Sequence, residues 1–218
     1  MGNDVKKFNE QSIGEEIANA ISHGIGAALA IAGTVLVIIR AAILSDGFGV
    51  VAASLYGAST IILFLFSTLY HSLTPYRAKK VFQIFDHCSI FILILGTYIA
   101  VAFTLLRGPK GWILFGINAA CTVVGIVFNS INLAKWRKAS LVLYLIMGWS
   151  VVMFIGDVLK ALSPAGIAFL VTGGVMYTLG VPFYVMKHKK FTHFIWHIFV
   201  LAGAVLHWFF VFYFCFPA

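Results

Sequence analysis

The chain has 218 residues, of which 61% are hydrophobic and 10% are charged, and its mean hydropathy is +1.01. Soluble domains are about half apolar and about a quarter charged, so this composition indicates an integral membrane protein of one domain. The formal net charge of +8 would also suit nucleic acid, but the basic residues form short clusters between apolar runs. That pattern is typical of loops beside an anionic leaflet, and we expect no nucleic-acid partner.

The chain opens with a polar segment, residues 1–16, and we expect a transmembrane domain at residues 17–218. Within the polar segment, Ser12 and Glu15 have the spacing of a capping box that opens a helix. Seven apolar runs follow, each near the roughly 20 residues that a helical span needs. The sequence therefore predicts an all-α bundle of seven transmembrane helices, at approximately 17–44, 49–72, 82–106, 112–133, 140–160, 164–186 and 192–216.

The basic residues are distributed unequally between the connecting segments. If the N-terminus is inside, the inner segments hold 11 of the 15 lysines and arginines and the outer segments hold 4. Lysine and arginine are enriched in cytoplasmic loops. We therefore expect a multi-pass protein of the cell membrane, with the N-terminal segment in the cytoplasm and the C-terminus outside. The inner basic residues are Lys6, Lys7, Arg77, Lys79, Lys80, Lys135, Arg137, Lys138, Lys187, Lys189 and Lys190.

Histidines gather at the inner ends of two runs. His193 and His197 are four residues apart, so on a helix they share one face, as in zinc sites built on a helix. His71 ends the second run and Asp86 opens the third, which places them at a similar depth. Three neutral imidazoles with water as a fourth ligand form a catalytic zinc arrangement. The sequence therefore predicts Zn²⁺ held by His71, His193 and His197, with Asp86 holding the water or taking its proton.

Ser67 has two interpretations. It lies one turn from His71 on the same helix face, so it could face the same site, but its hydroxyl could equally bond a carbonyl of its own helix. Phe194 occupies the position where an HExxH zinc motif has its base. Any base must therefore come from another helix, as Asp86 does.

Other polar residues receive simpler interpretations. His23 lies at the inner side and is a candidate neighbour of the metal ligands. His207 is about 15 Å deeper than His197 at helical rise, so we expect it to hydrogen-bond inside the bundle. We expect His87 and His188 to be solvated or hydrogen-bonded, and Asp157 to face the outer water. Five glycines are interpreted as close helix contacts: Gly96, Gly125, Gly148, Gly173 and Gly203.

Together these motifs resemble the hemolysin III family, the bacterial branch of the progestin and adiponectin receptor (PAQR) superfamily, which is grouped more widely with alkaline ceramidases. The likeness covers nearly the whole chain. One departure is Ile99-Ala100, where the family has Thr-Pro, and it puts no catalytic residue in doubt. The motifs are Glu15-Glu16-x-x-Asn19 with His23, Ser67-x-x-x-His71, Asp86-His87 followed by Gly96-Thr97-Tyr98, and His193-x-x-x-His197 with His207.

The resemblance implies seven helices around an internal cavity, with zinc on the three histidines and with Asp86 and Ser67 beside the metal-bound water. Relatives in the superfamily are linked to hydrolysis of ceramide or other lipid amides. Bacterial members are named for haemolysis and are also described as membrane-homeostasis proteins. Two hypotheses follow. One is a zinc-dependent intramembrane hydrolase of a lipid amide or ester, and the other is a lipid sensor or lytic protein with structural zinc. A membrane lipid is the expected substrate or ligand.

Overall fold

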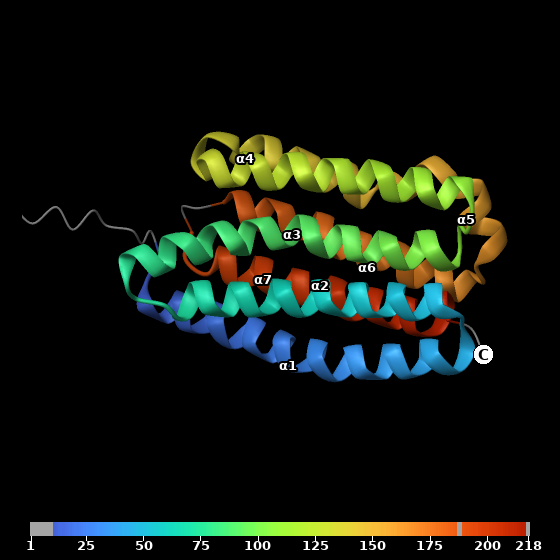
Figure 1. Cartoon of the computed structure of the whole chain (residues 1–218). Helices are drawn as coiled ribbons and strands as arrows, with labels where there is room; N and C mark the ends of the chain where they lie inside the picture. Colours follow the sequence, from blue (N-terminus) through green and yellow to red (C-terminus); the bar gives the residue numbers. More distant parts are fainter. Residues whose placement is uncertain (1–10, 187–188, 217–218) are drawn as a thin grey trace, which may run out of the picture.

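The computed structural model describes residues 11–186 and 189–216, and every regular element in these ranges is helical (Figure 1). The elements are α1 (Ile13–Leu44), α2 (Gly47–Ser72), α3 (Tyr76–Thr104), α4 (Pro109–Gly148), the 3₁₀ helix η1 (Ser150–Phe154), α5 (Ile155–Ala161), α6 (Pro164–Val185), α7 (Thr192–Phe210) and the π-helical turn η2 (Val211–Cys215).

The predicted capping box opens α1. The Ser12 hydroxyl accepts the backbone N–H of Glu15, and the Glu15 carboxylate accepts the backbone N–H of Ser12. The helix begins at Ile13, so it includes the end of the polar segment expected at 1–16. Glu15 and Glu16 are buried in the bundle. The first turn of α1 therefore belongs to the packed part of the protein.

Six helical stretches in the described ranges are long and apolar enough to cross a membrane. Many of their outward side chains are large and apolar, including Ile25 and Leu29 on α1, each 54% exposed. Such a surface suits lipid rather than water. The chain is thus a multi-pass, all-helical membrane protein.

The fourth of these stretches, Pro109–Ala161, has 53 residues. A straight helix of that length would be about 80 Å long, against about 30 Å for the hydrocarbon core of a bilayer. The helix is bent, because Asn132 has non-helical backbone angles, φ −160° and ψ 91°. The Ser140 hydroxyl donates to Asn129 Oδ1 across 2.6 Å. Because residues 129 and 140 would lie about 16 Å apart in a straight helix, the chain folds back on itself at Asn132.

The fourth and fifth predicted runs are therefore parts of one bent stretch. The prediction of a basic loop between them is wrong. Lys135, Arg137 and Lys138 lie on helical residues after the bend. Asn132 Oδ1 accepts the backbone N–H of Lys135 at 3.0 Å, which caps the start of the returning helix. One asparagine thus replaces the expected loop.

The predicted fifth run, 140–160, is not one continuous helix. It ends as α4 at Gly148, continues as η1 and then becomes α5. The Tyr98 hydroxyl donates to the carbonyl oxygen of Gly148 at 2.7 Å and accepts the backbone N–H of Val151 at 3.2 Å. The Tyr98 side chain from α3 thus satisfies the hydrogen bonds of backbone groups at the break, which allows the helix to be interrupted inside the bundle.

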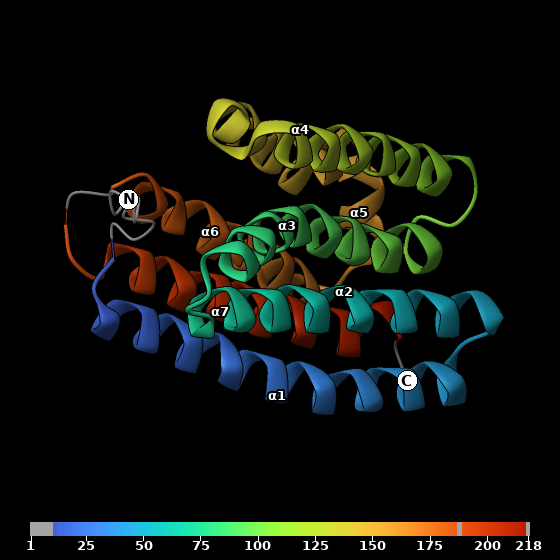
Figure 2. The same ribbon diagram turned by 60° about the vertical axis from the view of Figure 1, so that its left-hand side comes forward.

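The helices pack side by side in one bundle. The α1 helix contacts α2 and α7, α3 lies between α2 and α4, and α6 packs on α7 (Figures 1 and 2).

Close contact is confirmed at four of the five predicted glycines. A Cβ there would come within 3 Å of Ser59, Phe91, His207 or Tyr177, at Gly96, Gly125, Gly173 and Gly203 respectively. The prediction of a close contact at Gly148 is wrong, because no atom of the described residues lies within 4 Å of its Cβ position.

Two exposed ion pairs lie at the end of the bundle opposite His71. Arg107 donates to both carboxylate oxygens of Asp46, at 2.6 and 2.7 Å, and its hydrogen bonds hold the pKa of Asp46 well below its usual range. Asp157 pairs with Lys110 at 2.6 Å. Asp157 is thus at the surface as expected, with a lysine partner.

Candidate metal centre

Three histidines converge at one end of the bundle. His71 stands in the last turn of α2, and His193 and His197 stand in the first turns of α7. One ligand nitrogen from each ring lies within 4.8 Å of the others. His193 Nε2 is 3.1 Å from His197 Nε2, and the His71 ring centroid is 4.9 Å from that of His197. The three rings could hold a metal ion.

The first turn of α1 also holds the start of α7. Glu15 Oε1 accepts the backbone N–H of Phe191 at 2.7 Å. Phe191 has the left-handed φ of 61°, a conformation that costs about 1–3 kcal/mol for a residue other than glycine. The charge-assisted hydrogen bond offsets part of that cost. It places α7 so that His193 and His197 face His71.

His71 is oriented by residues that the sequence interpretation did not assign to the site. Its Nδ1 lies 2.7 Å from Glu16 Oε2, and the other Glu16 oxygen pairs with Lys79 at 3.1 Å. His71 Nε2 is buried and has no hydrogen-bond partner within residues 11–186 and 189–216. This orphaned nitrogen fits a metal ligand, because a buried lone pair otherwise carries a desolvation cost.

A usable signal for Glu16 was present in the sequence. Glu16, Asn19 and His23 recur at intervals of three and four, which places three polar residues on one face of an apolar helix. Lys79 gave no such signal. It was counted with a cytoplasmic loop, whereas α3 begins at Tyr76 and the Lys79 side chain is buried.

His23 lies directly against the cluster. Its ring stacks on His197 with centroids 3.6 Å apart and an interplanar angle of 12°, and the edge of Phe64 contacts it at 5.0 Å. His197 Nδ1 also lies 3.4 Å from the Ser22 hydroxyl. Two residues of α1 thus contact the His197 ring.

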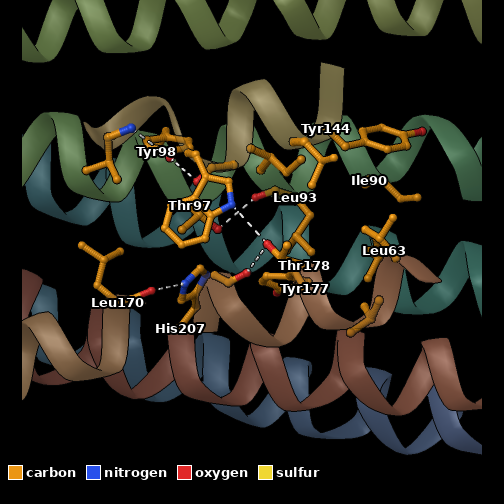
Figure 3. Close-up of a pocket in the computed structure, with 18 of the residues that line it drawn as sticks. Leu63, Ile90, Leu93, Thr97, Tyr98, Tyr144, Leu170, Tyr177, Thr178 and His207 are labelled. Atoms are coloured by element: carbon orange, nitrogen blue, oxygen red, sulfur yellow. Dashed lines mark hydrogen bonds between the residues drawn. The ribbon is translucent and has the colours of Figure 1, made fainter. Parts of the chain in front are cut away.

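A mostly apolar cavity of about 180 Å³ begins at this cluster and continues through the middle of the bundle. Its lining includes Ser67, Asp86, His193 and His197 at one end and His207 far along it. Figure 3 shows its middle part, with Thr97 and Tyr98 of α3, Leu170 and Thr178 of α6, and His207 of α7. The histidine cluster therefore adjoins a cavity whose mostly apolar lining is suited to a lipid acyl chain.

Asp86 and Ser67 both face this cavity beside the histidines. Asp86 is buried, and its Oδ2 lies 3.7 Å from His87 Nδ1. The Ser67 hydroxyl is buried and has no hydrogen-bond partner among the residues that the structure describes. The interpretation that Ser67 bonds back to its own helix is therefore wrong.

His207 and His87 each contact a backbone carbonyl oxygen. His207 Nε2 hydrogen-bonds the carbonyl oxygen of Leu170 at 3.1 Å, inside the bundle as expected. His87 is half-buried, and its Nδ1 lies 2.9 Å from the carbonyl oxygen of Gln83. His188 lies outside the described residues.

The sequence model of the family described as Haemolysin-III related matches residues 11–208. The chain belongs to the haemolysin-III related family. Hemolysin-3 of Bacillus cereus is 40% identical over 207 residues, covering 95% of this chain and 94% of that protein. The Hemolysin-3 homolog of Bacillus subtilis (strain 168) is 39% identical over 204 residues, covering 94% and 96%.

The human monocyte to macrophage differentiation factor is a more distant relative, 25% identical over 205 residues, covering 89% of this chain and 82% of that protein. The sequence resemblance to the hemolysin III family, with its distant relation to the PAQR superfamily, is thus confirmed. The range matched by the haemolysin-III related family contains every residue of the histidine cluster and its neighbours.

Proposed function

We propose that this haemolysin-III related protein is a zinc-dependent hydrolase that cleaves a lipid amide or ester within the membrane. One observation carries the proposal: three histidine ligand atoms lie within 4.8 Å of one another, and two of these histidines, His193 and His197, line one end of an apolar cavity. A metal site that adjoins a lipid-like cavity is suited to bring a reactive centre to a lipid carbonyl.

The ligand set supports zinc in a catalytic role. Neutral imidazoles are preferred zinc ligands, and three protein ligands with an open fourth position are typical of catalytic sites. In the described ranges, the metal-ligand cluster comprises His71, His193 and His197. When bound there, zinc would supply a Lewis acid that polarises a carbonyl and lowers the pKa of water to about 7.

The proposed roles of Asp86 and Ser67 follow from their positions in the cavity lining. The Asp86 carboxylate takes the proton of the attacking water and returns it to the leaving group. The Ser67 hydroxyl hydrogen-bonds the polar part of the substrate. Ser67 is a weaker candidate for the nucleophile, because no hydrogen bond in the described part of the chain joins its hydroxyl to a base.

The cavity favours a lipid with an acyl chain as the substrate. Its lining on α7 extends from His193 to His207, a rise of about 21 Å along the helix. Leu93 and Val200 are among its apolar side chains. We infer that the chain of the substrate lies along this cavity with its carbonyl at the histidines.

We further infer seven membrane crossings, because Pro109–Ala161 is long enough to cross twice and folds back at Asn132. The termini then lie on opposite sides of the cell membrane. The excess of basic residues near the histidine end supports a cytoplasmic N-terminus and an outer C-terminus. The metal centre would lie just inside the cytoplasmic face. Three of the basic residues in that count, Lys6, Lys7 and Lys187, lie outside the described ranges.

The test is release of fatty acid from defined lipids. Purified full-length protein, loaded with zinc in detergent, is incubated with N-acyl amides and matched acyl esters, and free fatty acid is quantified by mass spectrometry. We expect zinc-dependent release from at least one of these two classes. Bound zinc without release from either class would contradict the hydrolase and favour the lipid sensor.

A further inference from the structure

Glu16 stands in the first turn of α1, a helix that carries none of the three clustered histidines, yet its carboxylate contacts His71 directly. We propose that Glu16 positions His71 for metal binding, by fixing the tautomer and the orientation of its ring. This inference rests on the proposed metal site and is independent of whether that site performs hydrolysis.

The contact itself determines the tautomer. His71 Nδ1 lies 2.7 Å from Glu16 Oε2, a distance typical of a charge-assisted hydrogen bond. An ionised carboxylate only accepts hydrogen bonds, so Nδ1 must carry the proton. The lone pair of the neutral ring is then on Nε2, the buried nitrogen that has no partner. The tautomer set by Glu16 is thus the one that presents a ligand atom to the cluster.

Lys79 keeps Glu16 in the ionised form that this arrangement needs. Its Nζ lies 3.1 Å from Glu16 Oε1, and both side chains are largely buried, at 5% and 11% exposure. Lys79 Nζ also donates to the carbonyl oxygen of Tyr70, the residue before His71, at 3.1 Å. A buried carboxylate with a paired ammonium retains its charge. The two Glu16 oxygens therefore have separate partners. Oε1 pairs with the Lys79 ammonium, which stabilises the carboxylate charge, and Oε2 hydrogen-bonds His71.

A carboxylate behind a metal-binding histidine also makes the ring a better ligand. Such partners restrict ring rotation and raise the basicity of the coordinating nitrogen, and their loss typically costs about 10–100-fold in metal affinity or activity. In the alternative, purely structural role, the Glu16–His71 contact only holds α1 against α2 and has no effect on the metal. The two roles differ in their effect on metal affinity, which a purely structural tie would leave unchanged.

The experiment measures the zinc dissociation constant of purified full-length protein by competition with a chromogenic chelator. Because Glu16→Ala alone would leave Lys79 buried without its carboxylate, the main variant is the double substitution Glu16→Ala with Lys79→Met. We expect zinc binding about 10–100-fold weaker than in the native protein. Glu16→Gln, which keeps an acceptor but no charge, should lie between the two.

Lys79→Met alone removes the ammonium that keeps Glu16 ionised but leaves Glu16 beside His71, so its zinc affinity should fall by less than that of the double variant. Lys110→Met is the matched control, because it removes an exposed lysine paired with Asp157 at the opposite end of the bundle, and its zinc affinity should stay close to the native value. Thermal unfolding without metal measures any general loss of stability separately. Native zinc affinity in the double variant would overturn the inference while leaving the metal site intact. If the native protein binds no zinc, both the metal site and the role of Glu16 are refuted.

Discussion

His71 belongs to the candidate metal cluster and Asp86 lines the adjoining cavity. They have different roles in the proposed reaction, since one binds the metal and the other moves a proton. Asp86→Asn keeps the shape of the side chain and its ability to hydrogen-bond, but removes its ability to accept a proton. We expect this variant to fold, to keep most of its zinc, and to lose about 10²–10⁴-fold in lipid turnover. Fatty-acid release and zinc content are measured on the same preparation.

Asp157→Asn is the matched control, since Asp157 is an exposed carboxylate paired with Lys110 outside the cavity. It should retain turnover. Full activity of Asp86→Asn would refute its role as general base.

The spacing of residues predicted much of the candidate site, but not the groups that support it. His193 and His197 are found from their interval of four, and His71 and Asp86 from their matching depth. Lys79 could not be found in this way, because its contact with Glu16 joins residues 63 positions apart and depends on how the start of α3 lies against the start of α1. The free hydroxyl of Ser67 also depends on rotamer choice, which sequence spacing does not determine.

The α4 helix packs closely against α3 at Gly125. A Cβ on Gly125 would lie 2.1 Å from the ring of Phe91, a fully buried side chain of α3. Gly125→Ala must displace that ring, and we expect a loss of about 1–3 kcal/mol in the free energy of unfolding. The measurement is thermal or denaturant unfolding of purified protein in detergent.

Gly116→Ala provides a control in the same helix, because nothing lies within 4 Å of its Cβ position. It should be neutral or slightly stabilising, since alanine has the higher helix propensity. Equal destabilisation by both substitutions would contradict the packing of α3 against α4.

The helical elements themselves were predictable from the apolar runs, whereas their interruptions were not. The bend at Asn132 replaces a loop because one side chain caps the returning helix at Lys135. The break after Gly148 depends on Tyr98, a residue 50 positions earlier in the chain. A local pattern carries no information about such a distant partner, so the run 140–160 was interpreted as one helix.

For the molecule as a whole, the number of crossings decides on which side each terminus lies. If Pro109–Ala161 crosses twice, reporters fused to the two ends should show a cytoplasmic N-terminus and an outer C-terminus. The N-terminal position follows from the excess of basic residues at that side. A phosphatase and a fluorescent-protein fusion at each end measure this. Both termini on the same side would contradict the seven crossings.

The metal content of the purified protein tests the central claim most directly. Three imidazoles from α2 and α7 should hold about one zinc ion per chain, since a zinc site of three histidines binds a single ion. Elemental analysis should find that zinc in the native protein and find most of it lost in the double variant His71→Ala with His197→Ala. A chelator should also lower the thermal midpoint of the native protein, because a metal that binds only the folded state stabilises it. Full zinc retention in the double variant would contradict the site.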